Sequence, residues 1–577
     1  MSGQVDYSLY LVTDSTDAIL GSRDLVDVVE QALQGGRLHF PLSLHVPIPA
    51  SCSENYQLTT DAGVTIVQYR DKTSDTGNLI ATAKKLHEKC KKHNVPLLIN
   101  DRVDVALAVG CEGVHVGQDD MNVAEARRLL GEDKIIGATV SSIEEARIAV
   151  ERGADYLGIG TLYATQTKKN TKEIIGVNGI RKILSYLDEA GGKRKETKTV
   201  CIGGVNASNV QRIIHQLYAP RSSSSKPKAI DGVAVVSAIV GAKDPKQASA
   251  HLAQLTKSSP PFSKSSDPVF WLEKNEDEIK SLVSIADKAT EAVHSKSPLS
   301  HNMTNLVVQN FAANVALAIG ASPIMANYGE EAQDLSRLGG ALVVNMGTVT
   351  PEGLLNYKKA IAAYNATGGP IVLDPVGAGA TSVRRDALSQ LLGTGYFDLI
   401  KGNEREIMAV ARASGFTLDD SSQQRGVDSG DSLFSLEQRA YLVSRIALRE
   451  RNVVLMTGAT DVISDGVRTY AINNGHAYLG KITGSGCTLG TTLSAYLAAW
   501  PQDKLRAAVA GILHYEIAAE HAAKREDVKG PGTFVPAFID ELFTVGESVS
   551  EGKYTWGNDA NVECLKDIPD AGLLKDV

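Results

Sequence analysis

The sequence predicts an α/β protein of two domains, a closed parallel barrel followed by a helix–sheet–helix sandwich. Its 577 residues are too many for one hydrophobic core, so two domains of roughly 250 residues are expected. Short β-branched runs alternate with amphipathic helical segments along both halves, which is typical of parallel sheets. A Ser-, Pro- and Lys-rich stretch, TKSSPPFSKSSDP at 256–268, lacks apolar periodicity and is the candidate linker between the halves.

The first half contains eight candidate strands, and eight strands with helices between them predict a closed barrel. A doubly wound open sheet is the alternative for this half. Amphipathic segments such as NVAEARRLL (122–130) and SIEEARIAV (142–150) lie between the strands. The candidate strands are 9–13, 64–70, 96–100, 113–117, 134–139, 155–160, 199–204 and 232–237.

The second half is also α/β. Its candidate strands contain apolar runs, which suit strands covered by helices on both faces. These strands are 322–326, 341–345, 370–374, 398–402 and 453–457, and a helix-rich stretch follows them. We therefore place the domains at 1–255 and 273–548, the linker at 256–272, and a tail without a recognisable motif at 549–577.

One segment of the first half does not fit a barrel. The helical stretch 24–36 should lead directly into the strand at 64–70, but residues 37–62 intervene, with three Pro and no clear period. This insert is longer than most connections between a helix and a strand. It is either an active-site lid or the translation of a retained intron. The second interpretation is weakly favoured, because removing the insert restores a compact helix–strand junction.

Composition is that of an ordinary globular protein. Hydrophobic residues make up 43% and charged residues 22%, and the net charge of −8 argues against general nucleic-acid or membrane-surface binding. The six cysteines include no CxxC pair, and no secretory signal precedes them. No apolar run is long enough to span a bilayer. A cytoplasmic protein with free thiols is expected.

Polar residues follow the candidate strands of the first half, at the strand ends where a parallel barrel carries its chemistry. QYRDK sets Gln68, Arg70 and Lys72 at alternate positions, so all three face one side and suit a phosphate-bearing ligand. Asp101 and Asp120 follow neighbouring strands, and two such carboxylates can hold Mg²⁺ together with substrate phosphates.

Two further stretches add phosphate-binding groups. TQTKK supplies the hydroxyls of Thr165 and Thr167 and the ammonium group of Lys168. The glycines Gly203 and Gly204 open backbone N–H groups to a second phosphate. A metal, cations and hydroxyls that converge on one site indicate a diphosphate leaving group.

Each of these features alone also has an ordinary structural explanation. QYRDK fits a solvated strand end, and Asp101 and Asp120 fit helix caps. His115, inside the apolar run GVHVG, fits a buried and hydrogen-bonded core histidine better than a catalyst. The ordered combination over five strand ends is what favours an active site.

In order, QYRDK, INDRVDVALAVG, GVHVGQDD, DYLGIGTLYATQTKK, CIGGVN and GVAVVSAI resemble thiamine-phosphate synthase over roughly residues 5–250. That family is a TIM (β/α)8 barrel that joins hydroxymethylpyrimidine diphosphate to thiazole phosphate and releases diphosphate with Mg²⁺. The resemblance implies that Asp101 and Asp120 bind Mg²⁺ and that Lys168 is catalytic. It implies contacts to the pyrimidine diphosphate from Gln68, Arg70, Lys72, Asn100, Thr139 and Lys168, and contacts to the thiazole phosphate from Thr165, Thr167, Gly204, Val236 and Ser237.

The sequence departs from that family at three places. Thr139 stands where the family usually has Ser, which keeps the hydroxyl. Thr161 stands where it usually has Pro, which leaves the shape of that loop open. The insert at 37–62 adjoins the strand that bears Gln68 and could impair this half.

The second half has a Gly-x-Gly turn, TGSGCTLG, that runs into a helix. Such a turn offers free N–H groups and a positive helix end to a phosphoryl group. Asp374 and Glu406 follow candidate strands and are candidate Mg²⁺ ligands, directly or through water, with helix capping as the alternative. Met325 fits a core position better than a ligand contact. The Walker pattern GxxxxGK[ST] is absent from the sequence.

The stretches HNMTNLVVQNFAAN, ASPIMA, VLDPVGAGAT, KGNEREI and GSGCTLG, in that order, resemble hydroxyethylthiazole kinase, a ribokinase-like α/β/α family, over roughly residues 275–545. That family phosphorylates the thiazole alcohol with ATP and Mg²⁺. The resemblance implies thiazole contacts from Asn305, Met325 and Gly484, ATP contacts from Lys401 and Thr457, and metal binding by Asp374 and Glu406. Lys401 stands where many members have Arg.

Cys487 occupies the position at which related sugar kinases carry an Asp base, and members of the resembling family do carry Cys there. A free thiol has a pKa of about 8.5, which a helix N-terminus lowers, but a thiolate beside ATP phosphates is disfavoured. We expect Cys487 to be a catalytic residue of modest effect, with Mg²⁺ and the Gly484–Gly486 N–H groups contributing more.

The two resemblances support each other, because the product of the kinase is a substrate of the synthase. They predict a fused enzyme for two consecutive steps of thiamine assembly, as in fungi, with small-molecule partners. The kinase family is commonly trimeric, which implies a homo-oligomer. One alternative is a phosphosugar barrel fused to a sugar or pyrimidine kinase, against which Cys487 weighs. Another is a thiamine-pathway sensor without turnover, against which the retained carboxylates and Lys168 weigh.

Overall fold

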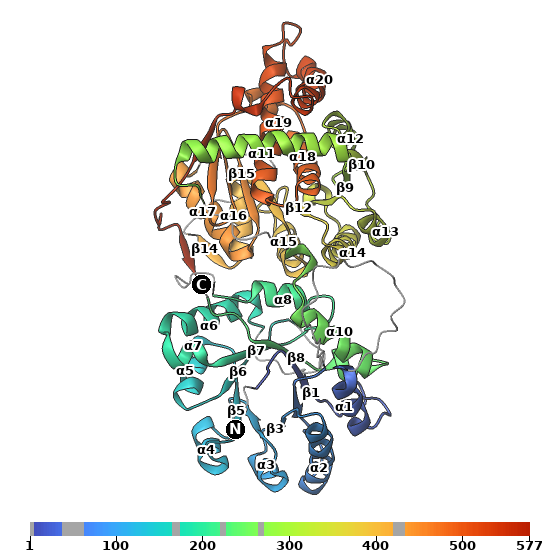
Figure 1. Ribbon diagram of the computed structural model, residues 1–577, viewed down its shortest axis with the longest axis vertical. Helices are drawn as coiled ribbons and strands as arrows, with labels where there is room; N and C mark the ends of the chain where they lie inside the picture. Colours follow the sequence, from blue (N-terminus) through green and yellow to red (C-terminus); the bar gives the residue numbers. More distant parts are fainter. Residues whose placement is uncertain are drawn as a thin grey trace, which may run out of the picture. The chain divides into compact units, whose positions relative to one another are not determined.

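The computed structural model describes residues 5–36, 63–163, 174–219, 227–263, 271–418 and 433–576. The chain divides into two compact units, Met1–Ser259 and Pro260–Val577, each with a core of its own (Figure 1). The insert at 37–62 lies outside the described residues, so its two interpretations stay open. Thr165, Thr167 and Lys168 lie outside them as well.

The first unit is a closed barrel of parallel strands in the order β1 to β8. The predicted closed barrel is confirmed and the open-sheet alternative is wrong, because β1 pairs with both β2 and β8. All the candidate strands of this half are present, with small shifts at their ends. The strands are β1 Leu9–Val12, β2 Ile66–Tyr69, β3 Leu97–Asn100, β4 Gly113–Val116, β5 Ile135–Val140, β6 Tyr156–Ile159, β7 Lys198–Ile202 and β8 Gly232–Val235.

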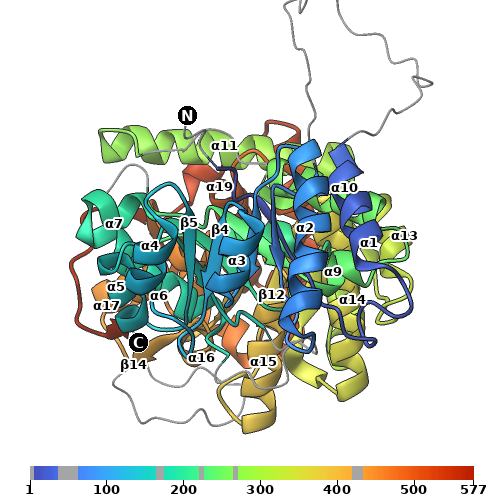
Figure 2. The same ribbon diagram turned by 90° about the horizontal axis from the view of Figure 1, so that it is seen from below.

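Helices cover the outside of the barrel strands (Figure 2). Polar residues cap their first turns: the side chain of Asp75 accepts from the Asn78 N–H, and that of Asn122 accepts from the Glu125 N–H. The helices are α1 Leu25–Leu33, α2 Thr76–Lys92, α3 Val103–Val109, α4 Val123–Leu130, α5 Ile143–Glu151, α6 Gly176–Ala190, α7 Gly192–Glu196, α8 Val210–Gln216, α9 Ser237–Val240 and α10 Pro245–Lys257.

Side chains fill the inside of the barrel, because alternate residues of each strand point inward. Ile66, Leu98 and Val200 belong to an apolar cluster separate from the core under the helices. Two residues further along β2 and β3, on the same face, lie Gln68 and Asn100. The inward series therefore changes from apolar to polar toward the C-terminal ends of the strands, where the candidate site lies.

The second unit is built on a nine-stranded sheet in the order β10-β9-β11-β12-β13-β15-β16-β17-β18. The strands from β10 to β15 are parallel, and the last three pair antiparallel. All five candidate strands of this half are present; the other strands were not predicted. The strands are β9 Leu299–Met303, β10 Ser322–Ile324, β11 Ala341–Asn345, β12 Ile371–Asp374, β13 Leu399–Asn403, β15 Val453–Thr457, β16 Asp461–Ser464, β17 Thr469–Ile472 and β18 Val562–Cys564.

Two helix layers enclose this sheet, as predicted for a helix–sheet–helix sandwich. Alternate residues of each strand contact opposite layers: Val343 and Val372 pack against one, Leu342 and Leu373 against the other. One layer holds α11 Asn275–Lys296, α12 Gln309–Ala318, α18 Ser485–Ala499, α19 Lys504–Lys524 and α20 Pro531–Ser550. The other holds α13 Ala332–Arg337, α14 Pro351–Thr367, α15 Ser382–Thr394, α16 Glu404–Ala413 and α17 Leu436–Glu450.

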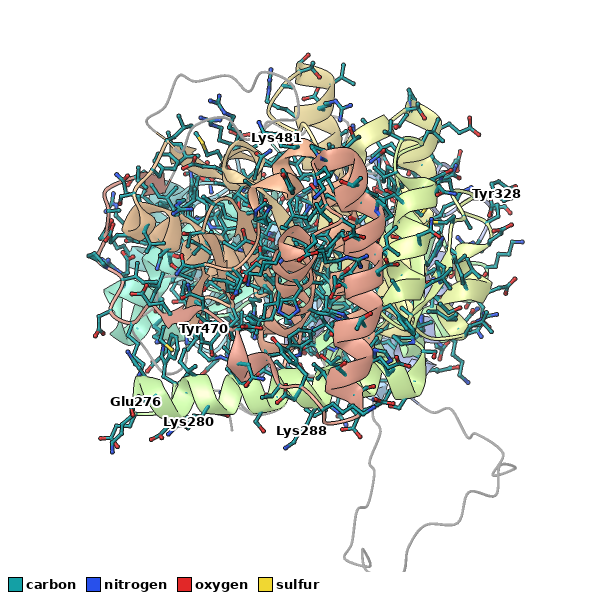
Figure 3. All side chains as sticks on the ribbon, turned by 90° about the horizontal axis from the view of Figure 1, so that it is seen from above. Glu276, Lys280, Lys288, Tyr328, Tyr470 and Lys481 are labelled. Carbon is teal, nitrogen blue, oxygen red and sulfur yellow. The ribbon has the colours of Figure 1, made fainter. Side chains whose placement is uncertain are left out.

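The polar face of α11 turns outward from this sandwich. Figure 3 shows Glu276, Lys280 and Lys288 pointing away from the body of the second unit, and all three are exposed. The opposite face of α11 buries Leu282, Ala286 and other apolar residues. None of the described helices is both long enough and apolar enough to cross a membrane.

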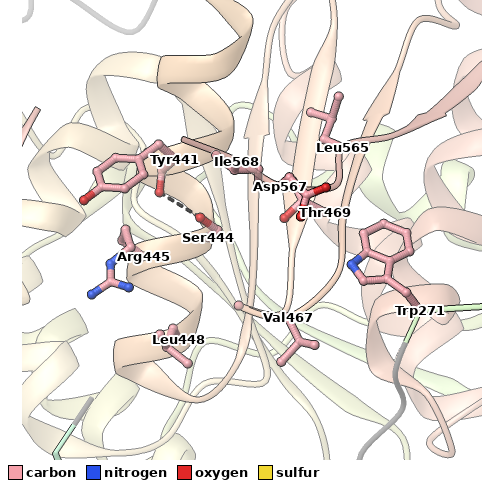
Figure 4. A pocket seen from close by; sticks show the side chains of 11 residues that line it. Trp271, Tyr441, Ser444, Arg445, Leu448, Val467, Thr469, Leu565, Asp567 and Ile568 are labelled. Atoms are coloured by element: carbon pink, nitrogen blue, oxygen red, sulfur yellow. Dashed lines mark hydrogen bonds between the residues drawn. The ribbon is translucent and has the colours of Figure 1, made fainter. Parts of the chain in front are cut away.

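The stretch after 549 is part of the second unit. It adds β18 to the edge of the large sheet and then forms β19 Leu574–Asp576, which pairs antiparallel with β14 Phe416–Leu418. Between the two strands it lines a cavity of about 220 Å³ (Figure 4). The lining includes Trp271, Tyr441, Arg445, Thr469 and Asp567. None of the residues predicted for catalysis or binding lines this cavity.

Candidate active sites

Three of the predicted pyrimidine-binding residues, Gln68, Asn100 and Thr139, lie toward the C-terminal ends of barrel strands. Gln68 is buried at the end of β2, and its Nε2 donates to Oδ1 of Asn100 at the end of β3, at 2.7 Å. Thr139 lies near the end of β5, and its hydroxyl oxygen is hydrogen-bonded to Nε2 of His115 at 2.8 Å. These contacts fix the three side chains before any ligand binds.

Charged residues lie around this polar group. Asp101 has a left-handed backbone, with φ of 64°, and its carboxylate forms an ion pair with Lys72. Its backbone N–H donates to the carbonyl of His115 at 2.8 Å, which ties the ends of β3 and β4 together. Arg70 reaches Asp14, a buried carboxylate that follows β1, with Nη1 and Oδ2 3.4 Å apart. Sequence reasoning missed Asp14, although it also follows a strand.

The two carboxylates predicted to bind Mg²⁺ differ in their surroundings. Asp101 is half-buried and turned toward Lys72, whereas Oδ2 of Asp120 accepts from the Gly117 N–H at 2.7 Å. Asp120 therefore caps a turn with Oδ2. Within the described ranges, no group of three or more His, Cys, Asp or Glu residues could hold a metal. The site fits a cation that takes its remaining ligands from substrate phosphates and water.

The predicted thiazole-phosphate side lies at the ends of β7 and β8. Gly203 and Gly204 have φ of 117° and 68°, and a side chain on Gly203 would come within 2.6 Å of Thr161 Cγ2. Only glycine fits there without strain. Val236 and Ser237 follow β8, and Ser237 begins α9. The glycine turn allows a ligand to approach the backbone closely. Thr165, Thr167 and Lys168, predicted for the same site, lie outside the described residues.

In the second unit, Lys401 and Asp374 meet under the first turn of α18. Lys401 in β13 is buried, and its Nζ lies 3.1 Å from Oδ2 of Asp374 at the end of β12. The same ammonium group donates to the carbonyl of Gly486 at 2.7 Å. Asn345, at the end of β11, donates to Oδ2 of Asp374 at 2.8 Å. Sequence reasoning missed Asn345, whose position at a strand end is the same kind of indication that identified Asp374.

Burial controls the charges of this group. Burial raises the pKa of Asp374, and Lys401 opposes that shift. Burial alone would lower the pKa of Lys401, but the charge of Asp374 above all holds it above its ordinary value. Since the two charged atoms are in contact, we assign the pair as an ammonium and a carboxylate. Oδ1 of Asp374 is buried without a hydrogen-bond partner in the described part of the chain, which suits a cation ligand.

Glu406 caps a helix, which is the alternative to metal binding that the sequence left open. Its Oε2 accepts from the Asn403 N–H at 2.9 Å and completes a capping box for α16. Its Oε1 accepts from the N–H of Gly377 at 2.8 Å and so holds the glycine turn after Asp374. Burial raises the pKa of Glu406 to about 7. Both oxygens are engaged, so a role in metal binding would run through water.

The glycine turn before α18 is tightly packed. Gly484 has φ of 88°, and a side chain there would come within 2.4 Å of Val308 Cγ1. Cys487, in the first turn of α18, is half-buried and lies 3.4 Å from Nδ2 of Asn305. Burial, reinforced by Asp374, raises the pKa of Cys487 to about 11, so the upward shift outweighs the helix N-terminus. The thiol is protonated at neutral pH. Met325 lies just beyond β10 and is half-buried.

A second carboxylate pair lies beside the predicted ATP contact Thr457. Asp461 begins β16, and its Oδ1 accepts from the Gly458 N–H at 2.9 Å. Glu516 faces it from α19, and both side chains are buried. Burial raises the pKa of Asp461 to about 6 and that of Glu516 further still, with repulsion from Asp461 adding to the latter. The pair was not predicted, because its two members are far apart in the sequence.

This pair makes the stability of the second unit depend on pH. A carboxyl whose pKa is raised in the folded state binds more protons folded than unfolded, so the free energy of unfolding falls as pH rises from about 4 through the raised pKa values of Asp461 and Glu516. Glu516→Gln is expected to weaken this fall, because it removes one of the two carboxyls that titrate. Thermal unfolding at pH 5 and pH 8 measures it: the variant should gain stability over the parent at pH 8 only. An equal gain in the free energy of unfolding at both pH values would contradict the raised pKa assigned to Glu516.

The chain matches proteins of known name over both units. A hydroxyethylthiazole kinase family model matches residues 290–548, and a thiamine monophosphate synthase model matches residues 9–239. The chain is 40% identical over 569 residues to a probable thiamine biosynthetic bifunctional enzyme of Schizosaccharomyces pombe, with 98% of this chain and 99% of that protein covered. It is 35% identical to a thiamine biosynthetic bifunctional enzyme of Saccharomyces cerevisiae, with 94% and 95% covered. A hydroxyethylthiazole kinase of Listeria monocytogenes is 42% identical over 252 residues, which covers 44% of this chain and 90% of that protein.

Proposed function

The chain belongs to the family of bifunctional thiamine biosynthetic enzymes, with a thiamine-phosphate synthase domain before a hydroxyethylthiazole kinase domain, and from this premise we propose which residues carry each reaction. The kinase domain phosphorylates hydroxyethylthiazole with ATP. The synthase domain joins the resulting thiazole phosphate to hydroxymethylpyrimidine diphosphate. The placement of polar side chains at the strand ends of both sheets is the main structural support for the residue assignments below.

In the synthase domain, Gln68, Asn100 and Thr139 orient the pyrimidine, and Arg70, Lys72 and Lys168 bind its diphosphate. Asp101 and Asp120 hold Mg²⁺, which when bound offsets the charge that develops on the departing diphosphate. The bond between the methylene carbon and the diphosphate oxygen breaks, and the thiazole nitrogen forms the new bond to that carbon. This nitrogen carries no proton, so the site needs no general base. Gly204, Thr165, Thr167, Val236 and Ser237 hold the thiazole phosphate.

In the kinase domain, the N–H groups around Gly484–Gly486 receive the phosphoryl group under transfer. Lys401 is fixed beneath that turn by Asp374 and by the Gly486 carbonyl. Asp374 holds Mg²⁺, with Glu406 acting through water, and the metal when bound offsets charge on the ATP phosphates. Asn305, Met325 and Gly484 bind the thiazole alcohol, and Thr457 binds ATP.

We infer a homo-oligomeric, cytoplasmic enzyme. Large apolar side chains are exposed on the kinase domain around α12, α13 and α14, namely Leu306, Val307, Tyr328, Leu338 and Leu355. Large apolar side chains left exposed in this way are typical of interfaces between subunits. Five described cysteines are free thiols, which suits a reducing compartment.

A coupled assay tests the whole assignment. The full chain is incubated with hydroxyethylthiazole, ATP, Mg²⁺ and hydroxymethylpyrimidine diphosphate, and thiamine phosphate is measured. We expect product formation that depends on all four components. Without any thiamine phosphate the bifunctional assignment falls. A chain that makes thiazole phosphate but no thiamine phosphate would direct attention to the insert at 37–62.

The raised pKa of Cys487 leads to a prediction for the kinase. Because the thiol is protonated at neutral pH, it is a poor base, and Cys487→Ser should cost well under the roughly 100-fold that loss of a general base costs. Cys487→Asp should keep or raise kcat. Steady-state kinase rates of both variants check this expectation. A collapse of activity in both would make the thiol essential.

A further inference from the structure

Six polar side chains form a continuous hydrogen-bonded row through the interior of the barrel. From one end to the other they are Asn100, Gln68, Tyr10, Tyr156, His115 and Thr139, on strands β3, β2, β1, β6, β4 and β5. The hydroxyl of Tyr10 donates to Oε1 of Gln68 at 3.1 Å and lies 2.6 Å from the hydroxyl of Tyr156. The Tyr156 hydroxyl lies 2.7 Å from Nδ1 of His115. The two ends of the row are residues already assigned to the pyrimidine, and the three in the middle are not.

The barrel is built around the middle of this row. Tyr10, Tyr156 and His115 are buried, and glycines on β5 and β6 leave space for two of these rings. A side chain on Gly137 would come within 2.1 Å of the Tyr156 ring, and one on Gly158 within 2.8 Å of His115 Cε1. Purely aliphatic layers would fill a barrel without these gaps. The two glycines are therefore matched to the two rings.

The donors and acceptors along the row determine the direction in which all its hydrogen bonds run. Gln68 donates to Asn100 through its amide nitrogen, so its oxygen accepts from the Tyr10 hydroxyl. Because the Tyr10 hydroxyl gives its proton to Gln68, its oxygen accepts the proton of the Tyr156 hydroxyl. The Tyr156 oxygen then has no proton left to give to His115, so it accepts from the Nδ1–H of His115. A neutral imidazole protonated at Nδ1 accepts at Nε2, so Thr139 donates its proton to His115.

The direction of the row decides what its two ends offer a ligand. The Thr139 oxygen, having given its proton to His115, is an acceptor toward the site. The Asn100 oxygen is taken by Gln68, which leaves the Asn100 amide N–H₂ as the donor. Reversing every bond would exchange these roles, so the row behaves as one unit.

We propose that Tyr10, Tyr156 and His115 are positioning residues of the synthase, which set Thr139 as an acceptor for an exocyclic amino group of the pyrimidine and Asn100 as a donor to a ring or diphosphate acceptor. This inference rests on the proposed function of the barrel and deepens it, because it states how the site selects an amino-substituted ring. A ring with a carbonyl oxygen in place of the amino group would meet a Thr139 lone pair and be rejected.

The first test reads the proton on His115 without any turnover. Solid-state ¹³C–¹⁵N spectra of the full chain with ring-labelled histidine distinguish the two tautomers, and His115→Asn identifies the His115 signals. The Nδ1–H tautomer is expected. An Nε2–H tautomer, or a ring protonated at both nitrogens, would overturn the proposal, since Thr139 would then have to donate to the ligand. This readout does not depend on whether the coupled assay yields thiamine phosphate.

The second test couples the row to catalysis. Tyr156→Phe removes only the hydroxyl, and we expect about a tenfold loss in kcat/KM for the pyrimidine diphosphate, comparable to Thr139→Val. In the double variant the two losses should not add, whereas Thr139→Ser should keep most activity. Tyr7→Phe is the matched control. The ring centroids of Tyr7 and Tyr156 lie 5.1 Å apart, but Tyr7 is not a member of the row.

Equal rates for Tyr156→Phe and Tyr7→Phe, or fully additive losses in the double variant, would show that the row is merely structural. If thermal unfolding shows that Tyr156→Phe does not fold, Tyr10→Phe replaces it. That variant breaks the same row one hydrogen bond away and is judged by the same criteria. Parent enzyme that uses the carbonyl-substituted ring as well as the amino-substituted ring would also overturn the selectivity.

Discussion

Asp101→Asn is expected to lower thiamine phosphate formation by on the order of 10³-fold while leaving the phosphorylation of hydroxyethylthiazole unchanged. The carboxylate pairs with Lys72 at the mouth of the barrel, and it is one of two assigned to Mg²⁺. Its replacement removes one of the two carboxylates assigned to the Mg²⁺ that would offset the charge on the departing diphosphate. Asn is the better replacement than Ala, because the backbone of Asp101 has φ of 64° and Asn tolerates that conformation.

Both activities can be measured on the same preparation, which makes the comparison internal. Asp104→Asn is the matched control: Asp104 lies three residues away, is exposed and pairs with Arg102, so its loss should leave both rates unchanged. If Asp101→Asn abolished both activities in a chain that still unfolds cooperatively, the picture of two independent sites would be wrong.

The barrel could be predicted because its strands are short apolar runs separated by amphipathic helices. The same reasoning missed β9, whose sequence LSHNM is polar although Ser300, His301 and Asn302 are buried. Those side chains are satisfied by partners far along the chain; for example, the Thr491 hydroxyl donates to Asn302 at 2.7 Å. A buried polar strand cannot be recognised until its partners are known.

In the candidate sites, too, some residues could be predicted from the sequence and others could not. Asn100 and Asp374 end their strands, Gln68 and Lys401 lie one or two residues before a strand end, and topology alone brings such positions to one edge of a sheet. Other residues act through contacts that sequence spacing does not reveal. Tyr10 and Tyr156 are 146 residues apart, yet their hydroxyls are hydrogen-bonded. His115 was expected to be a buried and satisfied core histidine, and it is one, but its partners include a predicted ligand contact.

Lys401→Met is expected to have the largest effect on the kinase, a loss of on the order of 10³-fold, without change in the synthase. Lys401 places its charge against Asp374 and under the glycine turn that receives the phosphoryl group. Without it, burial would raise the pKa of Asp374 further, so any residual activity should require a higher pH than the parent enzyme does. A pH–rate profile of the variant, with saturating thiazole and ATP, measures that shift.

Two further variants separate charge balance from catalysis. Lys401→Arg keeps the cation, and because many members of the kinase family carry Arg at this position, it should retain most of the activity. Lys401→Met alone leaves a buried carboxylate unpaired and should destabilise the second unit by about 3–5 kcal/mol. Adding Asp374→Asn removes that charge, so the double variant should recover stability but no activity. Recovery of activity in the double variant would mean that neither charge takes part in phosphoryl transfer, and that the Lys401–Asp374 pair serves only to hold the turn before α18.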